Sequence, residues 1–335
     1  MLPTLLLIMA LTASQGNVET ASSPEREVLP AEFRHDRVFV VPRYNGKKIN
    51  FFTDTGGGWN AVSRSTAEKF EVAIETIEND EGGSSELIAF PKFDDEYAIP
   101  APDPAYYRQG RLLVAADDAM AKWGDGFLGG RWFAGKIWEF DYPQKRLSRL
   151  RSWTAPKGKA HRQALGFQVD ARKIRTMHFP SFRVSIDGED LDMLLDTGAT
   201  ATLTEESAPV FGLKPGDAIG TSFIEHSVFA RWTDRHPDWR VLERADQNHD
   251  VRRMIEVPEI VVAGHRIGPV WFAEQPDGAF QQYMAAWMDR PTSGAIGGSA
   301  FRYLRLIIDY PGATAYFYRD APTSIHKLDS ERVAN

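Results

Sequence analysis

The sequence predicts a mainly β protein built from two homologous lobes, and three observations support this prediction. The tripeptide Asp-Thr-Gly occurs twice, at residues 54–56 and 196–198, each time after an apolar run. A second segment is also repeated, because residues 125–150 align with residues 293–318 without a gap. Short alternating runs dominate the chain and long helical periodicity is scarce, which is typical of mainly β proteins.

The repeat sets the organisation of the chain. The two segments align at a constant offset of 168 positions, whereas the tripeptides are offset by 142, so the second half carries 26 more residues between its two landmarks. Two copies are too few for a solenoid, and we infer an internal duplication. The identical pairs are Gly126/Gly294, Gly129/Gly297, Gly130/Gly298, Phe133/Phe301, Asp141/Asp309, Tyr142/Tyr310 and Pro143/Pro311.

The first 22 residues are typical of a signal peptide followed by a flexible start. Leu2–Leu11 is apolar except for Pro3 and Thr4, and small residues follow it. Such a run is too short to span a bilayer comfortably. We therefore expect export to the periplasm or the extracellular space, with an uncleaved membrane anchor as the alternative, since no Lys or Arg precedes the run. Residues 15–30 are polar and expected to be flexible.

Residues 30–150 form the predicted N-terminal lobe. Val38–Val41 and Lys48–Thr53 are expected to be strands around the turn Asn45-Gly46. A short helix is expected at Ser65, with Ser65 as its cap and Glu68 reaching back.

A basic linker at 151–160 precedes the predicted C-terminal lobe, residues 161–320, and residues 321–335 form a tail. In the C-terminal lobe, Phe182–Ile186 and Leu191–Leu195 are expected to form an equivalent hairpin around Asp187-Gly188.

The motifs resemble those of the aspartic proteases. Each Asp-Thr-Gly follows an apolar strand, and the apolar-apolar-Gly elements Phe127-Leu128-Gly129 and Ala295-Ile296-Gly297 come later in each half. Two copies in one chain resemble the bilobal pepsin arrangement, and the short lobes resemble bacterial retropepsin-like proteases. The resemblance covers roughly residues 31–320. It implies two β lobes related by a pseudo-twofold axis, with a substrate cleft between them.

Asp54 and Asp196 are the candidate catalytic residues. Two carboxyls about 3 Å apart cannot both ionise easily, so they share a proton. The ionised one takes a proton from water and the protonated one hydrogen-bonds to the substrate carbonyl. The resemblance therefore implies an aspartic endopeptidase that needs no cofactor and no metal. Ordinary turn aspartates are the alternative for both residues.

The neighbours of the two aspartates have expected supporting roles. Gly56 and Gly198 allow a sharp turn that brings N–H groups near the carboxylates, and the resemblance implies that Thr55 and Thr197 hydrogen-bond across the lobes. Glycines 129 and 297 would let the chain pass close to each loop, although strand glycines also mark simple bulges. Gly57 stands where pepsin-like enzymes usually have Ser or Thr after Asp-Thr-Gly, which puts in doubt how the ionisation of Asp54 is tuned. Ala199, at the same place in the second copy, also occurs in retroviral proteases.

The resemblance also implies a flap, and the best candidate lies between Asp80 and Ile99. Its tip would contain Gly82 and Gly83, and Tyr97 is either the flap tyrosine or a structural strand residue. The extra length of the second half lies between residues 220 and 250. It contains Trp232, Trp239 and three histidines, at 226, 236 and 249, whose spacing fits no standard metal site, so a solvated or cleft-lining loop is favoured.

Composition excludes several function classes. The net charge of −7, without a basic cluster, argues against nucleic-acid binding. The chain has no cysteine, which excludes disulfides, thiolate metal sites and cysteine nucleophiles. The expected partner is a peptide or protein substrate, and the expected state is a monomer because both carboxylates are in one chain. The competing hypothesis is a non-catalytic peptide-binding protein on the same fold.

Overall fold

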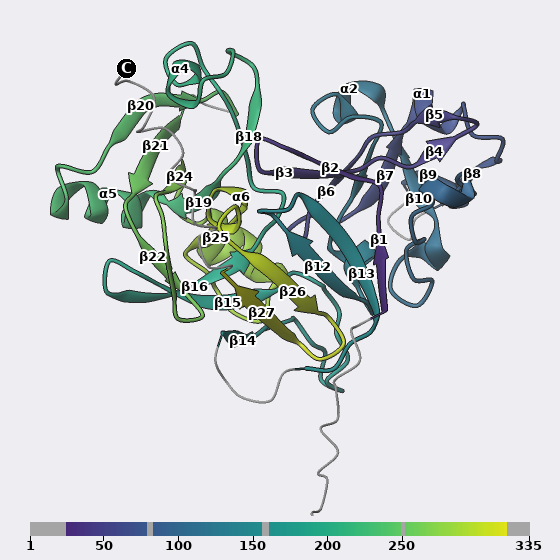
Figure 1. Cartoon of the computed structure of the whole chain (residues 1–335). Helices are drawn as coiled ribbons and strands as arrows, with labels where there is room; N and C mark the ends of the chain where they lie inside the picture. Colours follow the sequence, from purple (N-terminus) through teal and green to yellow (C-terminus); the bar gives the residue numbers. More distant parts are fainter. Residues whose placement is uncertain (1–24, 79–82, 156–160, 249–251, 320–335) are drawn as a thin grey trace, which may run out of the picture.

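The computed structural model describes residues 25–78, 83–155, 161–248 and 252–319 (Figure 1). The chain is mainly β, as predicted, with an eight-stranded, a nine-stranded and a six-stranded sheet and two small two-stranded sheets. The predicted signal segment 1–22, the tail 321–335, Gly82 and His249 lie outside the described residues.

The eight-stranded sheet is built from residues 31–128 in the order β2-β3-β6-β11-β7-β10-β9-β8. The predicted hairpin is confirmed, since β3 pairs antiparallel with β6 and the short strands β4 and β5 flank Asn45-Gly46. Both turn residues have positive φ, 49° and 74°, which Asn and Gly tolerate. The strands are β2 (Ala31–Arg34), β3 (Arg37–Val40), β4 (Arg43–Tyr44), β5 (Lys47–Lys48), β6 (Phe51–Thr53), β7 (Asn60–Ser63), β8 (Ile74–Glu78), β9 (Ser84–Ile88), β10 (Leu112–Ala115) and β11 (Gly126–Leu128).

The nine-stranded sheet is built from residues 181–296 in the order β20-β21-β24-β19-β25-β16-β15-β22-β23. Its predicted hairpin is also confirmed, with Asp187 and Gly188 at φ 51° and 76° between β15 and β16. The strands, with the separate pair β17–β18, are β15 (Ser181–Ile186), β16 (Glu189–Leu195), β17 (Thr200–Thr202), β18 (Ala218–Gly220), β19 (Ser222–Glu225), β20 (Val241–Asp246), β21 (Arg252–Val257), β22 (Ile260–Val262), β23 (His265–Ile267), β24 (Val270–Gln275) and β25 (Gly294–Ile296).

The two large sheets share one local pattern of strand pairing. In the first, β11 lies parallel to β6 and antiparallel to β7. In the second, β25 lies parallel to β16 and antiparallel to β19. In both sheets, the strand that leads into Asp-Thr-Gly (β6 or β16) thus pairs with the strand that leads to Gly129 or Gly297 (β11 or β25). The sequence duplication is therefore a duplication of strand topology.

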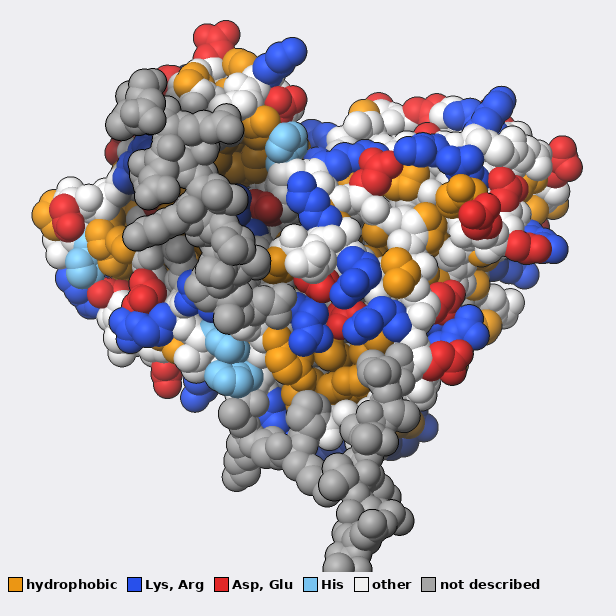
Figure 2. Space-filling view, viewed as in Figure 1, with side chains coloured by type: hydrophobic (Ala, Val, Ile, Leu, Met, Phe, Trp, Pro, Cys, Tyr) orange, Lys and Arg blue, Asp and Glu red, His pale blue; other side chains and the backbone are white. Residues whose placement is uncertain are grey.

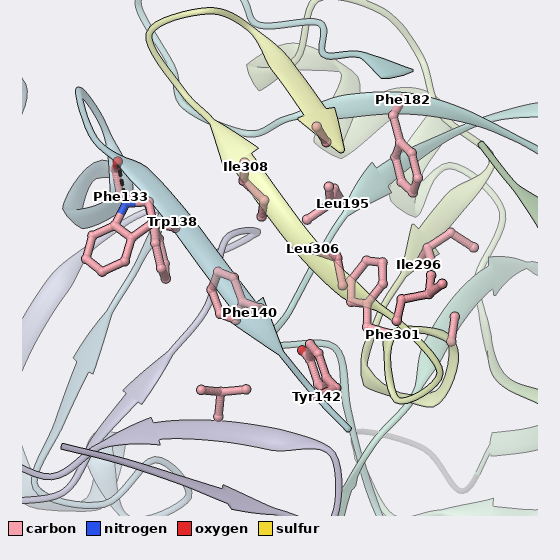
Figure 3. Packing of buried hydrophobic residues seen from close by; sticks show 14 of the residues in the cluster. Phe133, Trp138, Phe140, Tyr142, Phe182, Leu195, Ile296, Phe301, Leu306 and Ile308 are labelled. Atoms are coloured by element: carbon pink, nitrogen blue, oxygen red, sulfur yellow. Dashed lines mark hydrogen bonds between the residues drawn. The ribbon is translucent and has the colours of Figure 1, made fainter. Parts of the chain in front are cut away.

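The six-stranded sheet joins the two repeated segments, because β12 pairs antiparallel with β26. On one side, Phe140 and Leu306 pack with Leu195 and Ile296, the last strand residues before Asp196 and Gly297 (Figure 3). This core therefore packs against the strand ends that lead into the second Asp-Thr-Gly loop and Gly297. The strands, in sheet order, are β1 (Glu25–Val28), β13 (Arg146–Ser152), β12 (Ile137–Asp141), β26 (Arg305–Asp309), β27 (Thr314–Tyr318) and β14 (Arg162–Ala164).

The same sheet carries a network of ion pairs. Lys and Arg side chains gather over β12 and β26 in Figure 2. Glu139 is 0% exposed and pairs with Arg26 at 2.7 Å and with Arg305 at 3.1 Å. Arg26 belongs to β1, so the prediction that residues 15–30 are flexible is wrong for residues 25–28. These residues form a strand because their charges pair across to the neighbouring strands.

The helices are short, and the longest described one is the ten-residue α5. The prediction that Ser65 caps the first helix is wrong: Ser63, in extended conformation at the end of β7, accepts the N–H of Thr66. No helix within the described ranges is long and apolar enough to cross a membrane. The helices are α1 (Arg64–Ala67), α2 (Asp117–Met120), α3 (Gly130–Phe133), α4 (Ala208–Phe211), α5 (His226–Arg235) and α6 (Gly298–Phe301).

The extra length of the second half is mostly a helix and a strand, α5 and β20, so the prediction of a loop is wrong, but Phe223, Asp246 and Asn248 of this segment do line a cavity with Asp54 and Asp196. Apolar side chains at 228, 229 and 232 form the buried face of α5. Trp232 is 0% exposed and packs edge-on against Phe272 of β24. Trp239 stacks on His236.

Candidate active site

The two Asp-Thr-Gly loops begin in the same way. The N–H of Asp54 donates to the carbonyl of Leu128, and the N–H of Asp196 donates to the carbonyl of Ile296, both at 2.9 Å. Each loop then turns so that its glycine N–H donates to its own aspartate. The distance is 2.7 Å from Gly56 N to Asp54 Oδ1 and 2.9 Å from Gly198 N to Asp196 Oδ1.

The structure brings the two aspartates together. Their carboxyls line one cavity, each lies against the glycine of the opposite loop, and Asp196 is 8% exposed. The glycines make this approach feasible, because a Cβ on Gly56 would lie 2.7 Å from Asp196 Cγ. A Cβ on Gly198 would overlap the Asp54 carboxyl in the same way. Each glycine therefore faces the carboxyl of the opposite loop.

The two threonines interlock the loops, as the resemblance implied. Thr197 N donates to Thr55 Oγ1 at 3.0 Å, and Thr55 N donates to Thr197 Oγ1 at 3.2 Å. The Thr55 hydroxyl also donates to the Leu195 carbonyl at 2.7 Å. Both threonines are 0% exposed. These bonds fix the relative position of the two aspartates.

Burial and mutual repulsion set the protonation of the pair. Burial raises the pKa of Asp54 well above its usual value, and the charge of Asp196 raises it further. Burial also raises the pKa of Asp196, but the hydrogen bond with Asp54 lowers it. The pair titrates as a unit, so the shared proton belongs to the pair and not to one residue.

The structure explains the unusual Gly57. A Cβ at this position would lie 2.5 Å from Phe127 Cε1, so the phenyl ring occupies the space of the usual Ser or Thr side chain. The hydroxyl that the resemblance led us to expect is absent, and an apolar ring lies at this place beside Asp54. An apolar neighbour favours the neutral carboxyl, in line with the direction of the Asp54 pKa.

Gly129 and Gly297 hold the chain close to the loops. A Cβ on Gly129 would lie 2.5 Å from the carbonyl oxygens of Gly57 and Trp59, and a Cβ on Gly297 would overlap the Thr221 carbonyl. Both glycines are therefore needed for close backbone packing, and the interpretation as simple bulges does not apply.

A cavity of about 260 Å³ opens beside the aspartates. Sequence reasoning missed most of its lining, which comes from segments far apart in the chain and carries no motif. The lining residues are Asp54, Lys122, Trp123, Asp196, Gly198, Thr200, Phe223, Asp246, Asn248, Arg252 and Gln275.

The predicted flap is only partly described. Gly83 is exposed and directly precedes β9, which pairs with β8 in a hairpin at the edge of the eight-stranded sheet. This hairpin and the exposed Trp59 line a second cavity of about 420 Å³. Tyr97 is not on the hairpin. It lies in a 3₁₀ turn, Asp95–Tyr97, and Arg43 covers its ring at 4.2 Å, so the contacts of Tyr97 are structural.

The two described histidines of segment 220–250 hydrogen-bond to carboxylates. His226 contacts Glu274 at 2.6 Å and His236 contacts Asp187 at 2.7 Å. Over the described ranges, no group of His, Asp and Glu side chains has the arrangement of a metal site.

No family model and no curated protein matches the chain. The case for a function therefore rests on its own residues.

Proposed function

We propose that this protein is an aspartic endopeptidase with two β lobes related by a pseudo-twofold axis and a substrate cleft between them. The observation that carries the proposal is the close approach of Asp54 and Asp196, each of which lies against the glycine of the opposite loop at one cavity. Each carboxyl accepts a glycine N–H of its own loop, and the loops are interlocked by Thr55 and Thr197. The glycine N–H bonds also occur in ordinary Asx turns, whereas the interlocked threonines and the approach of two carboxyls do not follow from a turn alone.

The chemistry follows from the shared proton. We assign the ionised role to Asp196, which takes a proton from a water bound between the carboxyls, and that water attacks the peptide carbonyl. Asp54 donates its proton to the carbonyl oxygen as the tetrahedral intermediate forms. The proton on Asp196 then passes to the nitrogen, the C–N bond breaks, and Asp54 takes back a proton from a hydroxyl of the intermediate, which restores the shared proton. No covalent intermediate is required.

Export and a monomeric state complete the proposal. The apolar run at residues 2–11 supports export, and both carboxylates belong to one chain. A non-catalytic peptide-binding protein remains the competing hypothesis, and turnover separates the two.

The test is cleavage of a denatured protein at mildly acid pH, followed by mass spectrometry. We expect wild-type protein to cut internal bonds and the variants Asp54→Asn and Asp196→Asn each to lose cleavage. The double variant should lose little more, because the residues act as one unit. Substantial cleavage by either folded single variant would overturn the assignment.

A further inference from the structure

The cavity beside the aspartates is lined by two cations from distant segments. Lys122 follows α2, and Arg252 begins β21. Within the described ranges, neither has a carboxylate within 4.0 Å: Lys122 donates to the amide oxygen of Asn248 at 3.3 Å, and Arg252 donates to that of Gln275. Both cations thus donate to neutral acceptors, and Arg252 also attracts the carboxylate of Asp246, its partner in the β20–β21 register, without forming a close ion pair.

A third cation lies behind Lys122. Arg37 is 7% exposed, donates to the Lys122 carbonyl at 3.4 Å and lies 4.6 Å from the centre of the Phe52 ring. Its Nε has no hydrogen-bond partner in the described part of the chain. Burial lowers the pKa of Arg37 to about 10, so it remains charged at neutral pH. Burying this guanidinium costs free energy of folding, and its charge adds to the positive potential around Lys122.

The negative groups of the cavity do not cancel these charges. The aspartate pair carries about one negative charge when it shares a proton. Asp246 is 1% exposed, and its Oδ1 accepts N–H bonds from Thr202 at 2.8 Å and Asn248 at 3.0 Å. Burial raises the pKa of Asp246, whereas its N–H bonds and the charge of Arg252 lower it. Even with Asp246 ionised, Lys122, Arg252 and Arg37 outnumber the negative charges of Asp246 and the shared-proton pair.

We propose that Lys122 and Arg252 bind a carboxylate of the substrate, so that this site prefers peptides with an anionic group close to the scissile bond. The inference rests on the proposed function and names its substrate class. The carboxylate is either an Asp or Glu side chain or the C-terminus of the peptide. The rings of Trp123 and Phe223 line the same cavity and would contact the apolar stem of that group.

The experiment measures binding separately from turnover, in the Asp54→Asn protein. This variant keeps about one negative charge on the pair, because Asp196 ionises. The probes are fluorescein-labelled hexapeptides with one Glu at each position in turn, their Gln counterparts, and each peptide as C-terminal acid and amide. Binding is read by fluorescence anisotropy at low and high salt.

We expect one Glu position or the free C-terminus to strengthen binding about tenfold, the effect of 1.4 kcal/mol. The preference should weaken in high salt and fall below about twofold when Lys122→Gln and Arg252→Gln are combined. Lys214→Gln, an exposed site outside this cavity, is the control for Lys122→Gln alone, since each removes one positive charge, and it should keep the preference. Lys122→Gln alone, at an exposed side chain, should show part of the loss if the double variant misfolds.

Equal binding of acidic and neutral probes, binding of no probe, or a preference that survives the double variant would overturn the inference. Its failure is distinct from failure of the proposed function. Carboxylate-selective binding without cleavage by wild-type protein would refute the peptidase and support the site. Cleavage without carboxylate selectivity would do the reverse.

Discussion

Replacing Thr55 by Val tests the interlock between the two loops. Valine keeps the shape of threonine but removes the hydroxyl that accepts from Thr197 N at 3.0 Å and donates to the Leu195 carbonyl at 2.7 Å. Both partner residues are 0% exposed, so water cannot replace the lost bonds. An unsatisfied buried polar group costs about 1–3 kcal/mol, so the two together cost about 2–6 kcal/mol. This is a large share of the roughly 5–15 kcal/mol that stabilises a typical protein.

The reciprocal change should cost about half as much. Thr197→Val removes a hydroxyl that accepts one N–H, from Thr55 at 3.2 Å, so we expect a loss of about 1–3 kcal/mol. Urea unfolding followed by circular dichroism gives both free energies. Thr55→Ser retains the hydroxyl and should be close to wild type.

Thr53→Val provides a matched control for function. The Thr53 hydroxyl donates at 2.8 Å to the Val38 carbonyl of the adjacent strand and does not join the two loops. This variant should lose stability but keep kcat, whereas Thr55→Val should lower both. A cost below about 1 kcal/mol for Thr55→Val, or a larger cost for Thr197→Val, would refute the reasoning.

Three further predictions concern the same loops. The folded-state pKa of Asp54 is raised above its usual 3.8, so the stability of the wild-type protein falls as pH rises from 3.8 through the raised pKa. Asp54→Asn should therefore raise Tm at pH 7.5 and change it little at pH 3.5. An equal change in Tm at both pH values would contradict this. Gly198→Ala should abolish peptide cleavage by displacing the Asp54 carboxyl, whereas Gly58→Ala, whose Cβ would meet only Phe179 at 3.5 Å, should stay active. Gly57→Ser should lower Tm because the ring of Phe127 must move, and an unchanged Tm would show that the ring does not fill that space.

Local chemistry made much of the fold predictable. Asn45-Gly46 and Asp187-Gly188 adopt positive φ at low cost, so both hairpins could be placed from sequence. The duplicated tripeptides indicated Asp54 and Asp196. The glycine of each tripeptide is required because the carboxyl of the opposite loop lies against it and leaves no room for a side chain.

Features that depend on tertiary contacts were not predictable. The strand β1 carries Glu25, Arg26 and Glu27 and has little apolar alternation, so no strand pattern marks it in the sequence. Its side chains instead form ion pairs across the sheet, such as Glu27 with Arg149 at 2.5 Å. Lys122 and Arg252 are separated by 130 positions in the sequence, and only the folded chain brings both to the same cavity. By contrast, α5 had a readable signal, since Val228, Phe229 and Trp232 follow helical spacing.

The pH profile of kcat/KM on one cleaved peptide tests the central claim most directly. A proton shared by Asp54 and Asp196 predicts a bell, because one carboxyl must be ionised and the other protonated. The alkaline limb should lie above the usual range of a carboxyl, since burial raises both pKa values. Activity should vanish at every pH in Asp54→Asn and Asp196→Asn. A profile that keeps its shape and height in either folded variant would contradict the account.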